Sequence, residues 1–171
     1  MTALLRLLCA GIIALTLAGC AGYHLGPSNG QLAGAKSIQI NPFVNKTLEP
    51  RLNDYVMNSL RKTLQQDGTF QLNTHDEGDV IVTGVITSYV PVGLSVQPTD
   101  VLTVVDYEIT MTVQVTARDR ATGKVLFDQL VKGRTTLRAG NDLTSAERQA
   151  LPLLAEDFAK NATSLLADGS W

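Results

Sequence analysis

The longest regular pattern in this sequence runs from Val105 to Ala117, where apolar and polar residues alternate almost without a break. A period of two is typical of a β-strand that buries one face and leaves the other in solvent. At about 3.3 Å per residue such a strand reaches roughly 43 Å. We therefore expect the chain to fold around a long, half-buried strand of an antiparallel sheet.

The residues that follow predict a partner for this strand. Ala121-Thr122-Gly123 has the composition of a three-residue hairpin loop with Gly123 in the left-handed conformation, and it leads into a second strand over Lys124–Thr136. The loop sets the register, with Arg120 opposite Lys124. On the covered side this register pairs Ala117 with Phe127 and Val113 with Val131. On the other side it pairs Arg118 with Leu126, Thr116 with Asp128, Thr112 with Lys132 and Thr110 with Arg134, so that one face gathers the basic residues.

Two segments show the three- and four-residue spacing of an amphipathic helix. The first covers Leu52–Leu64 and is stopped by Asp67-Gly68. The second begins at the capping box Thr144-Ser145-Ala146-Glu147 and continues to Leu165. Because proline removes a backbone donor and clashes with the preceding turn, Pro152 predicts either a kink or a later start.

Shorter strands are expected at Ser37–Ile40 and Val80–Tyr89, each followed by a proline. Two helices that each need an apolar surface then define the fold class. We expect an α+β fold, a two-layer sandwich in which both helices pack on one face of a mainly antiparallel four-stranded sheet.

The N-terminal residues have the layout of a bacterial export signal. Arg6 precedes an uninterrupted apolar run that is too short to span a bilayer and ends in Leu17-Ala18-Gly19-Cys20, which matches the lipobox. We expect cleavage before Cys20 and lipidation of its sulfur. Residues 1–19 are then a signal peptide, residues 20–35 a lipidated cysteine with a flexible tether, and residues 36–171 a single domain. The alternative is a secreted protein cut after Ala18 or Gly19.

The residue types in this chain argue against several classes of function. A net charge of −2 argues against a general nucleic-acid binder. The only histidines, His24 and His75, leave no economical metal site or catalytic triad, and the only cysteine besides Cys20 lies in the signal peptide. A G-x-S-x-G motif centred on Ser28 lies in the tether, without the strand and helix that a nucleophile elbow requires. We therefore expect no enzyme, no cofactor and no metal site.

Binding surfaces are the remaining candidates, and the first is basic. The stretch from Arg118 to Arg138 is locally cationic within an acidic protein. Arginine and lysine on one sheet face are suited to phosphates or carboxylates, so we take this face as a candidate binding surface for an anionic ligand. The residues concerned are Arg118, Arg120, Lys124, Lys132 and Arg134. The alternative is an ordinary solvated face whose charges discourage edge pairing.

The second candidate is an apolar segment between the two central strands. Its exposed apolar residues favour contact with a partner protein, although the segment could instead fold back on the core. Pro91, Gly93 and Pro98 predict a loop and not a continuation of the sheet. The residues expected to contact the partner are Val90, Pro91, Val92, Leu94 and Val96.

Two stretches of the sequence resemble one known family. Cys20-Ala21-Gly22-Tyr23-His24-Leu25 is similar to its cysteine-x-Gly-Tyr-x-Leu start, and the segment IQINPFVNKTLEP from Ile38 to Pro50 is similar to its first strand and the turn into its first helix. The family is that of the lipopolysaccharide-assembly lipoproteins, LptE. The resemblance covers the chain from Cys20 to about Asp168.

This resemblance implies an outer-membrane lipoprotein, anchored at Cys20, that plugs a β-barrel translocon (LptD), helps it assemble and binds lipopolysaccharide during its insertion into the outer leaflet. The residue after the lipidated cysteine is Ala21, and in this the chain resembles lipoproteins that are released to the outer membrane. Aspartate at this position would be the usual signal for retention. The alternative function is a lipid-anchored periplasmic regulator of a cell-wall synthase, a class that usually needs a longer tether. An esterase built around Ser28 has almost no support.

Overall fold

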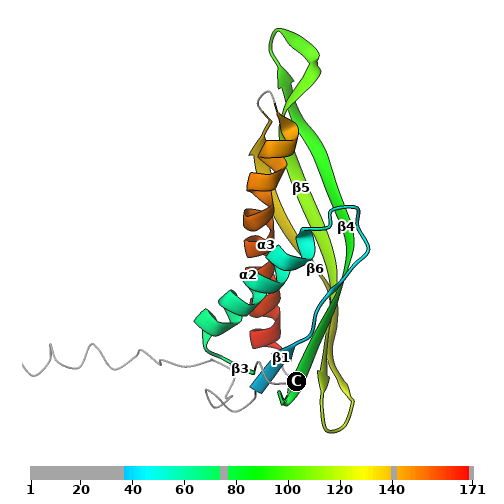
Figure 1. Cartoon of the computed structure of the whole chain (residues 1–171), viewed down its shortest axis with the longest axis vertical. Coiled ribbons are helices and arrows are strands. Elements are labelled where there is room, and N and C mark those ends of the chain that lie inside the picture. The colour runs from blue at the N-terminus through cyan, green and yellow to red at the C-terminus, as the bar shows by residue number, and fades with distance from the viewer. Residues whose placement is uncertain (1–36, 74–76, 140–141, 170–171) are drawn as a thin grey trace, which may run out of the picture.

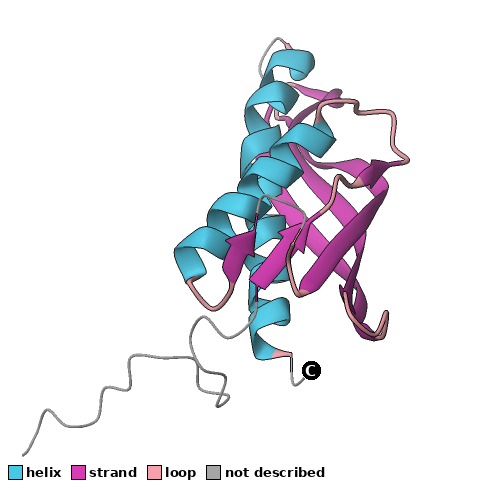
Figure 2. Ribbon diagram, turned by 60° about the horizontal axis from the view of Figure 1, so that its bottom comes forward, coloured by secondary structure: helices cyan, strands magenta, loops and turns pink. Residues whose placement is uncertain are grey.

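The computed structural model describes residues 37–73, 77–139 and 142–169. The expected signal peptide, Cys20 and the tether lie outside this part of the chain. The described elements, in chain order, are β1 (Ser37–Ile40), β2 (Val44–Asn45), α2 (Leu52–Asp67), β3 (Gln71–Asn73), β4 (Val80–Gln97), β5 (Asp100–Asp119), β6 (Val125–Arg138) and α3 (Leu143–Asp168). Both helices cover the same face of the sheet (Figures 1 and 2).

The sheet is larger and more mixed than the sequence predicts. It has six strands in the order β3-β1-β4-β5-β6, with β2 also paired to β4. β1 runs parallel to both β3 and β4, and β2 runs parallel to β4, whereas β4, β5 and β6 are antiparallel. The expected mainly antiparallel sheet of four strands is therefore wrong, because the sheet has six strands with mixed pairing, although the α+β class with two helices is confirmed. The parallel part arises because α2 serves as a crossover that returns the chain to the sheet beside β1.

The core is built from the two sequence patterns that predict it, the alternation on β5 and the apolar spacing on the two helices. On β5 the side chains of Ile109, Met111, Val113, Val115 and Ala117 are buried without exception. Facing them, α2 and α3 present apolar stripes that include Leu60, Leu64, Leu154 and Phe158, all fully buried. The helix-facing side of the sheet is thus the hydrophobic side, and the opposite face is open.

The C-terminal end of α2 follows the expected chemistry, whereas its start at Arg51 has no side-chain cap and the start of α3 also differs. Gly68 stops α2 with a left-handed φ of 73°, and its N–H donates to the Leu64 carbonyl at 3.3 Å. α3 is capped by Asp142, whose side chain accepts from the Ser145 N–H at 3.2 Å, in place of the expected Thr144 capping box. α3 continues through Pro152, which lies on an exposed position, from Leu143 to Asp168.

The apolar segment that the sequence assigns to a loop is the outer part of β4. Val90 pairs with Thr110 and Pro91 with Ile109, so the loop prediction is wrong. β2 pairs with β4 only as far as Ile86, and along the rest of that edge no described strand pairs with β4. Proline is tolerated on such an edge because no partner needs its missing N–H. The resulting β4–β5 hairpin projects beyond the N-terminal end of α3 (Figure 1).

No helix among the described residues combines the length and the apolar character needed to cross a membrane.

Candidate functional site

The open face of the sheet is built from rows of side chains that run across β4, β5 and β6. The register of the three strands defines these rows, because residues directly opposite each other on antiparallel strands point to the same side. From the base of the sheet toward the projecting hairpin the rows are Thr83·Thr116·Asp128, Val85·Gln114·Leu130, Ser88·Thr112·Lys132, Val90·Thr110·Arg134, Val92·Glu108·Thr136 and Ser95·Asp106·Arg138.

Two neighbouring rows place two cations beside two hydroxyls. Lys132 lies opposite Thr112, and Arg134 lies opposite Thr110, as the sequence predicts. Within the part of the chain that the structure describes, neither cationic side chain has a hydrogen-bond or ion-pair partner. We call these four residues, Thr110, Thr112, Lys132 and Arg134, the cationic cluster. The sequence predicts both pairs, but it assigns a binding role only to the two cations.

Helix α3 fixes the backbone that carries the two cations. Asp157 Oδ2 accepts a hydrogen bond from the Arg134 backbone N–H at 2.8 Å. Asn161 Nδ2 donates to the Lys132 carbonyl at 2.9 Å. Between them, Gly133 allows α3 to approach the strand closely. The side chains of Lys132 and Arg134 therefore project into solvent from a strand segment whose backbone is hydrogen-bonded to α3.

The other three predicted basic residues lie apart from this cluster. Arg120 turns toward the start of β4 and β1, where its Nε donates to the Gly78 carbonyl at 2.8 Å and its Nη2 donates to Gln39 Oε1. Arg118 is exposed at the end of β5, and Lys124 is exposed beside the hairpin turn. The structure therefore does not gather all five cations into one group.

The carboxylate of Asp128 on β6 is already engaged. It accepts hydrogen bonds from Gln114 Nε2 at 2.6 Å and from Thr116 Oγ1 at 2.9 Å. These two bonds, with a smaller contribution from the charge of Arg118, lower the pKa of Asp128 below its ordinary value.

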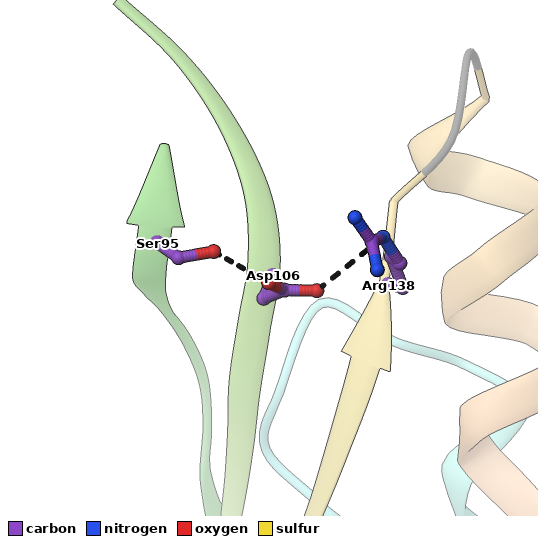
Figure 3. Close-up of polar contacts among 3 residues, drawn as sticks. All are labelled: Ser95, Asp106 and Arg138. Carbon is purple, nitrogen blue, oxygen red and sulfur yellow. Dashed lines mark hydrogen bonds and ion pairs between the residues drawn. The ribbon is translucent and has the colours of Figure 1, made fainter. Parts of the chain in front are cut away.

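The last row joins the three strands where the projecting hairpin begins (Figure 3). Ser95 Oγ on β4 donates to Asp106 Oδ2 on β5 at 2.5 Å, and Arg138 Nε on β6 lies 3.8 Å from Asp106 Oδ1. The Arg138 side chain is 81% exposed, so the ion pair contributes little to stability. Arg138 is nevertheless paired, which distinguishes it from Lys132 and Arg134.

The predicted partner-contact residues form an exposed apolar strip along the outer part of β4. The exposed fractions are 47% for Val90, 52% for Val92, 57% for Leu94 and 43% for Val96. Pro91 is also exposed and belongs to the same strip. Val90 and Val92 point to the open face, in the rows of Thr110 and Glu108. The apolar strip and the cationic cluster therefore border the same surface.

A groove that the sequence did not reveal lies between the loop before α2 and β4. Its volume is about 460 Å³, and residues 46–49 and 87–89 together with Pro91 line it. The loop is held by Asn45, whose Nδ2 donates to the Glu49 carbonyl at 2.7 Å. The Tyr89 hydroxyl on the β4 side is buried without a hydrogen-bond partner. Burial, followed by the charges of Glu147 and Glu49, raises the pKa of Tyr89 to about 12.

No group of three or more histidine, cysteine or acidic side chains suitable for a metal occurs among residues 37–73, 77–139 and 142–169. The chemistry on the open face is that of recognition: unpaired cations, hydroxyls and exposed aliphatic side chains.

The open face of this two-layer α+β domain is therefore a candidate binding surface. This chain is a member of the LptE, lipopolysaccharide-assembly, family, whose model matches residues 35–164. Membership in this family indicates the role of a lipoprotein in lipopolysaccharide assembly.

Solved structures share the fold. The chain is similar to the hypothetical protein CT253 from Chlamydia trachomatis, with a TM-score of 0.57 at 9% identity, over 81% of this chain and 98% of that one. A minor lipoprotein from Acinetobacter baumannii gives a TM-score of 0.52 at 15% identity, over 77% and 92% of the two chains. A putative lipoprotein from Caulobacter crescentus gives 0.51 at 12% identity, over 74% and 88%. A search of curated proteins finds no significant match.

Proposed function

We propose that this protein is an outer-membrane lipoprotein that plugs the β-barrel translocon LptD, helps it assemble, and binds lipopolysaccharide during its insertion into the outer leaflet. The family match over residues 35–164 carries this proposal. The open face supports it, because unpaired cations beside exposed aliphatic side chains suit a phosphorylated lipid. No catalytic or cofactor role is part of the proposal.

Attachment to the membrane is assigned to Cys20. Residues 1–19 are removed as a signal peptide, residues 20–35 carry the lipid and connect it to the domain, and residues 36–171 form that domain. Each buried methylene contributes about 0.8 kcal/mol, so two or more acyl chains hold the protein on the membrane without help from the polypeptide. A Cys20→Ala variant should lose labelled palmitate and leave the membrane fraction.

Contact with the barrel is assigned to the apolar strip. Aliphatic side chains that are about half exposed on a projecting strand are suited to burial against another protein. The hairpin tip extends this surface, since Leu102 is 90% exposed. A barrel lumen that surrounds the sheet would cover this part of the chain.

Contact with lipopolysaccharide is assigned to the basic residues of the sheet and its hairpin. They provide charge-assisted hydrogen bonds to the phosphates of the lipid. The residues proposed are Arg118, Arg120, Lys124, Lys132 and Arg134.

Affinity purification of the full lipoprotein from detergent-solubilised outer membranes tests the plug. We expect LptD in the eluate in a one-to-one ratio. Leu94→Ser together with Val96→Ser should reduce that ratio, whereas Val125→Ser, a change of an exposed valine on β6 outside the strip, should leave it unchanged. Recovery of cell-wall synthases without LptD would overturn the proposal in favour of a regulator of those enzymes.

A further inference from the structure

We propose that Thr110, Thr112, Lys132 and Arg134 bind one phosphate group of an acylated phosphoglycolipid, and that the acyl chains of this lipid lie over Val90 and Val92. This inference rests on the proposed lipopolysaccharide binding and narrows it to one place on the sheet. Of the five basic residues considered for binding, it selects two.

The spacing of the cationic cluster fits a single phosphate. Lys132 and Arg134 are two residues apart on one face of β6, which places their backbones roughly 7 Å apart. Directly opposite residues on antiparallel strands have Cβ atoms about 5 Å apart, so Thr112 and Thr110 lie beside the two cations. A phosphate between the four side chains receives hydrogen bonds from an ammonium, a guanidinium and two hydroxyls.

The cluster is preorganised, and its two cationic side chains form no ion pair among the described residues. α3 holds the backbone at Lys132 and Arg134 through Asn161 and Asp157, so binding does not have to order the strand. The nearest acid on the same strand, Asp128, is occupied by Gln114 and Thr116. By contrast, Arg120 is already bonded to Gly78 and Gln39.

Glu108 sets the limit of the site on the side of the projecting hairpin. It lies in the next row, opposite Thr136 and diagonal to Arg134. Its negative charge repels a phosphate from that row, so the phosphate is favoured between Arg134 and Lys132.

The apolar neighbours favour a lipid over a free phosphate. Val90 completes the row of Thr110 and Arg134, and Val92 occupies the next row. Two strand spacings of about 4.8 Å separate β4 from β6, so aliphatic side chains lie roughly 10 Å from the cations across the sheet. A molecule with a charged head and acyl chains covers both sides, whereas inorganic phosphate uses only one. The apolar strip is thereby divided: Val90 and Val92 face the lipid, and Leu94 and Val96 are left for the barrel.

A binding titration of the mature lipoprotein in detergent with purified lipopolysaccharide tests the assignment. We expect Lys132→Gln with Arg134→Gln to weaken binding at least ~10-fold, through the loss of two charge-assisted contacts. The matched control, Arg61→Gln with Lys62→Gln, removes the same charge from the exposed side of α2 and should stay within about twofold. Dephosphorylated lipopolysaccharide should bind wild type as weakly as it binds the Lys132/Arg134 variant.

A comparison of lipopolysaccharide with inorganic phosphate tests whether the site binds a lipid or a free phosphate. Val90→Ser with Val92→Ser should weaken binding of lipopolysaccharide and leave the weak binding of inorganic phosphate unchanged. Equal losses from the two charge variants, or no loss from Lys132/Arg134, would overturn the cluster while lipopolysaccharide binding by wild type still stood. Absence of binding by wild type would instead remove the proposed function itself. Unchanged urea unfolding of each variant confirms that folding is intact.

Discussion

Gly133 on β6 lies so close to Phe158 on α3 that a Cβ atom at position 133 would come 2.7 Å from the Cβ of Phe158 and 2.7 Å from the carbonyl oxygen of Leu154. Backbone as well as side chain forms this contact, so a change of rotamer at Phe158 cannot relieve it. A close approach of helix and sheet therefore occurs at the residue between the two cations of the open face.

Gly133→Ala should destabilise the domain, because the added methyl forces α3 away from β6. Overpacking of this kind costs about 1–3 kcal/mol in the free energy of unfolding. Urea unfolding measures the change, and Thr136→Ala, on the exposed side of the same strand, is the control. Equal stability of the two variants would contradict the close contact.

The register of the β5–β6 hairpin shows what the sequence can determine. The pairs from Thr110/Arg134 to Ala117/Phe127 are those expected from the alternating pattern. The turn itself differs from the expectation that Arg120 pairs with Lys124. The Asp119 N–H donates to the Lys124 carbonyl, and Arg118 lies opposite Val125. A bulge between Ala117 and Arg118 compensates for the shift. Burial of one face fixes the pairing even where the turn departs from expectation.

Other parts of the site depend on contacts that a linear pattern does not contain. The cationic cluster was foreseeable because register alone aligns Thr112 with Lys132. The bond from Arg120 to Gln39 was not, since the two residues are 81 positions apart in the sequence. The sequence predicts that a strand ends before Pro91, because the position of Pro91 on a free edge becomes known only from the placement of β2. The exposed strand and the engaged arginine are therefore results of tertiary structure.

Asp157 and Asn161 form hydrogen bonds to the free edge of β6. Loss of Asp157 should lower the free energy of unfolding and increase self-association of the protein. Asp157→Ala leaves the Arg134 N–H without its acceptor, which costs about 1 kcal/mol. It also exposes a strand edge that can pair with a second chain. Asp157→Asn keeps an oxygen acceptor and should behave nearly as wild type. Unfolding curves and light scattering on concentrated samples compare the three proteins; an Ala variant indistinguishable from wild type would argue that the edge needs no cover.

Arg120 should matter for stability more than Arg118. Arg120→Gln removes the bonds to the Gly78 carbonyl and to Gln39, which tie the β5–β6 hairpin to β1 and the start of β4. We expect a loss of about 1.5–3 kcal/mol, as for hydrogen bonds that involve a charged group. Arg118→Gln, at an exposed position, should stay within about 0.5 kcal/mol. The reverse order in thermal or urea unfolding would refute this assignment.

Asp142 should make the start of α3 sensitive to acid. Hydrogen bonds from the side chain and backbone of Ser145 lower the pKa of Asp142 below its ordinary value of 3.8. A lowered pKa in the folded state means that the stabilisation is complete above pH 3.8 and disappears as the pH falls through the folded-state value. Asp142→Asn keeps the cap but does not titrate, so its stability should fall less steeply below pH 4. Urea unfolding at pH 7, 4 and 3 provides the comparison, and parallel pH profiles would rule out the cap as their source.

Tyr89 should give the opposite dependence at alkaline pH. Its hydroxyl is buried without a partner, and burial, with smaller contributions from Glu147 and Glu49, raises its pKa to about 12. Because the unfolded chain loses this proton near the ordinary pKa of 10.0, the folded state binds more protons between pH 10 and 12, and stability falls as the pH rises through that range. Tyr89→Phe removes both the titration and an unsatisfied polar group, so it should be as stable as wild type at pH 7 and lose less between pH 10 and 12. Unfolding in urea at pH 7, 10 and 11 tests both statements, with Tyr107→Phe on β5 as the control. A clear loss of stability in Tyr89→Phe at pH 7 would mean that the hydroxyl has a partner in solution, and the groove beside it would then be the place to look for one.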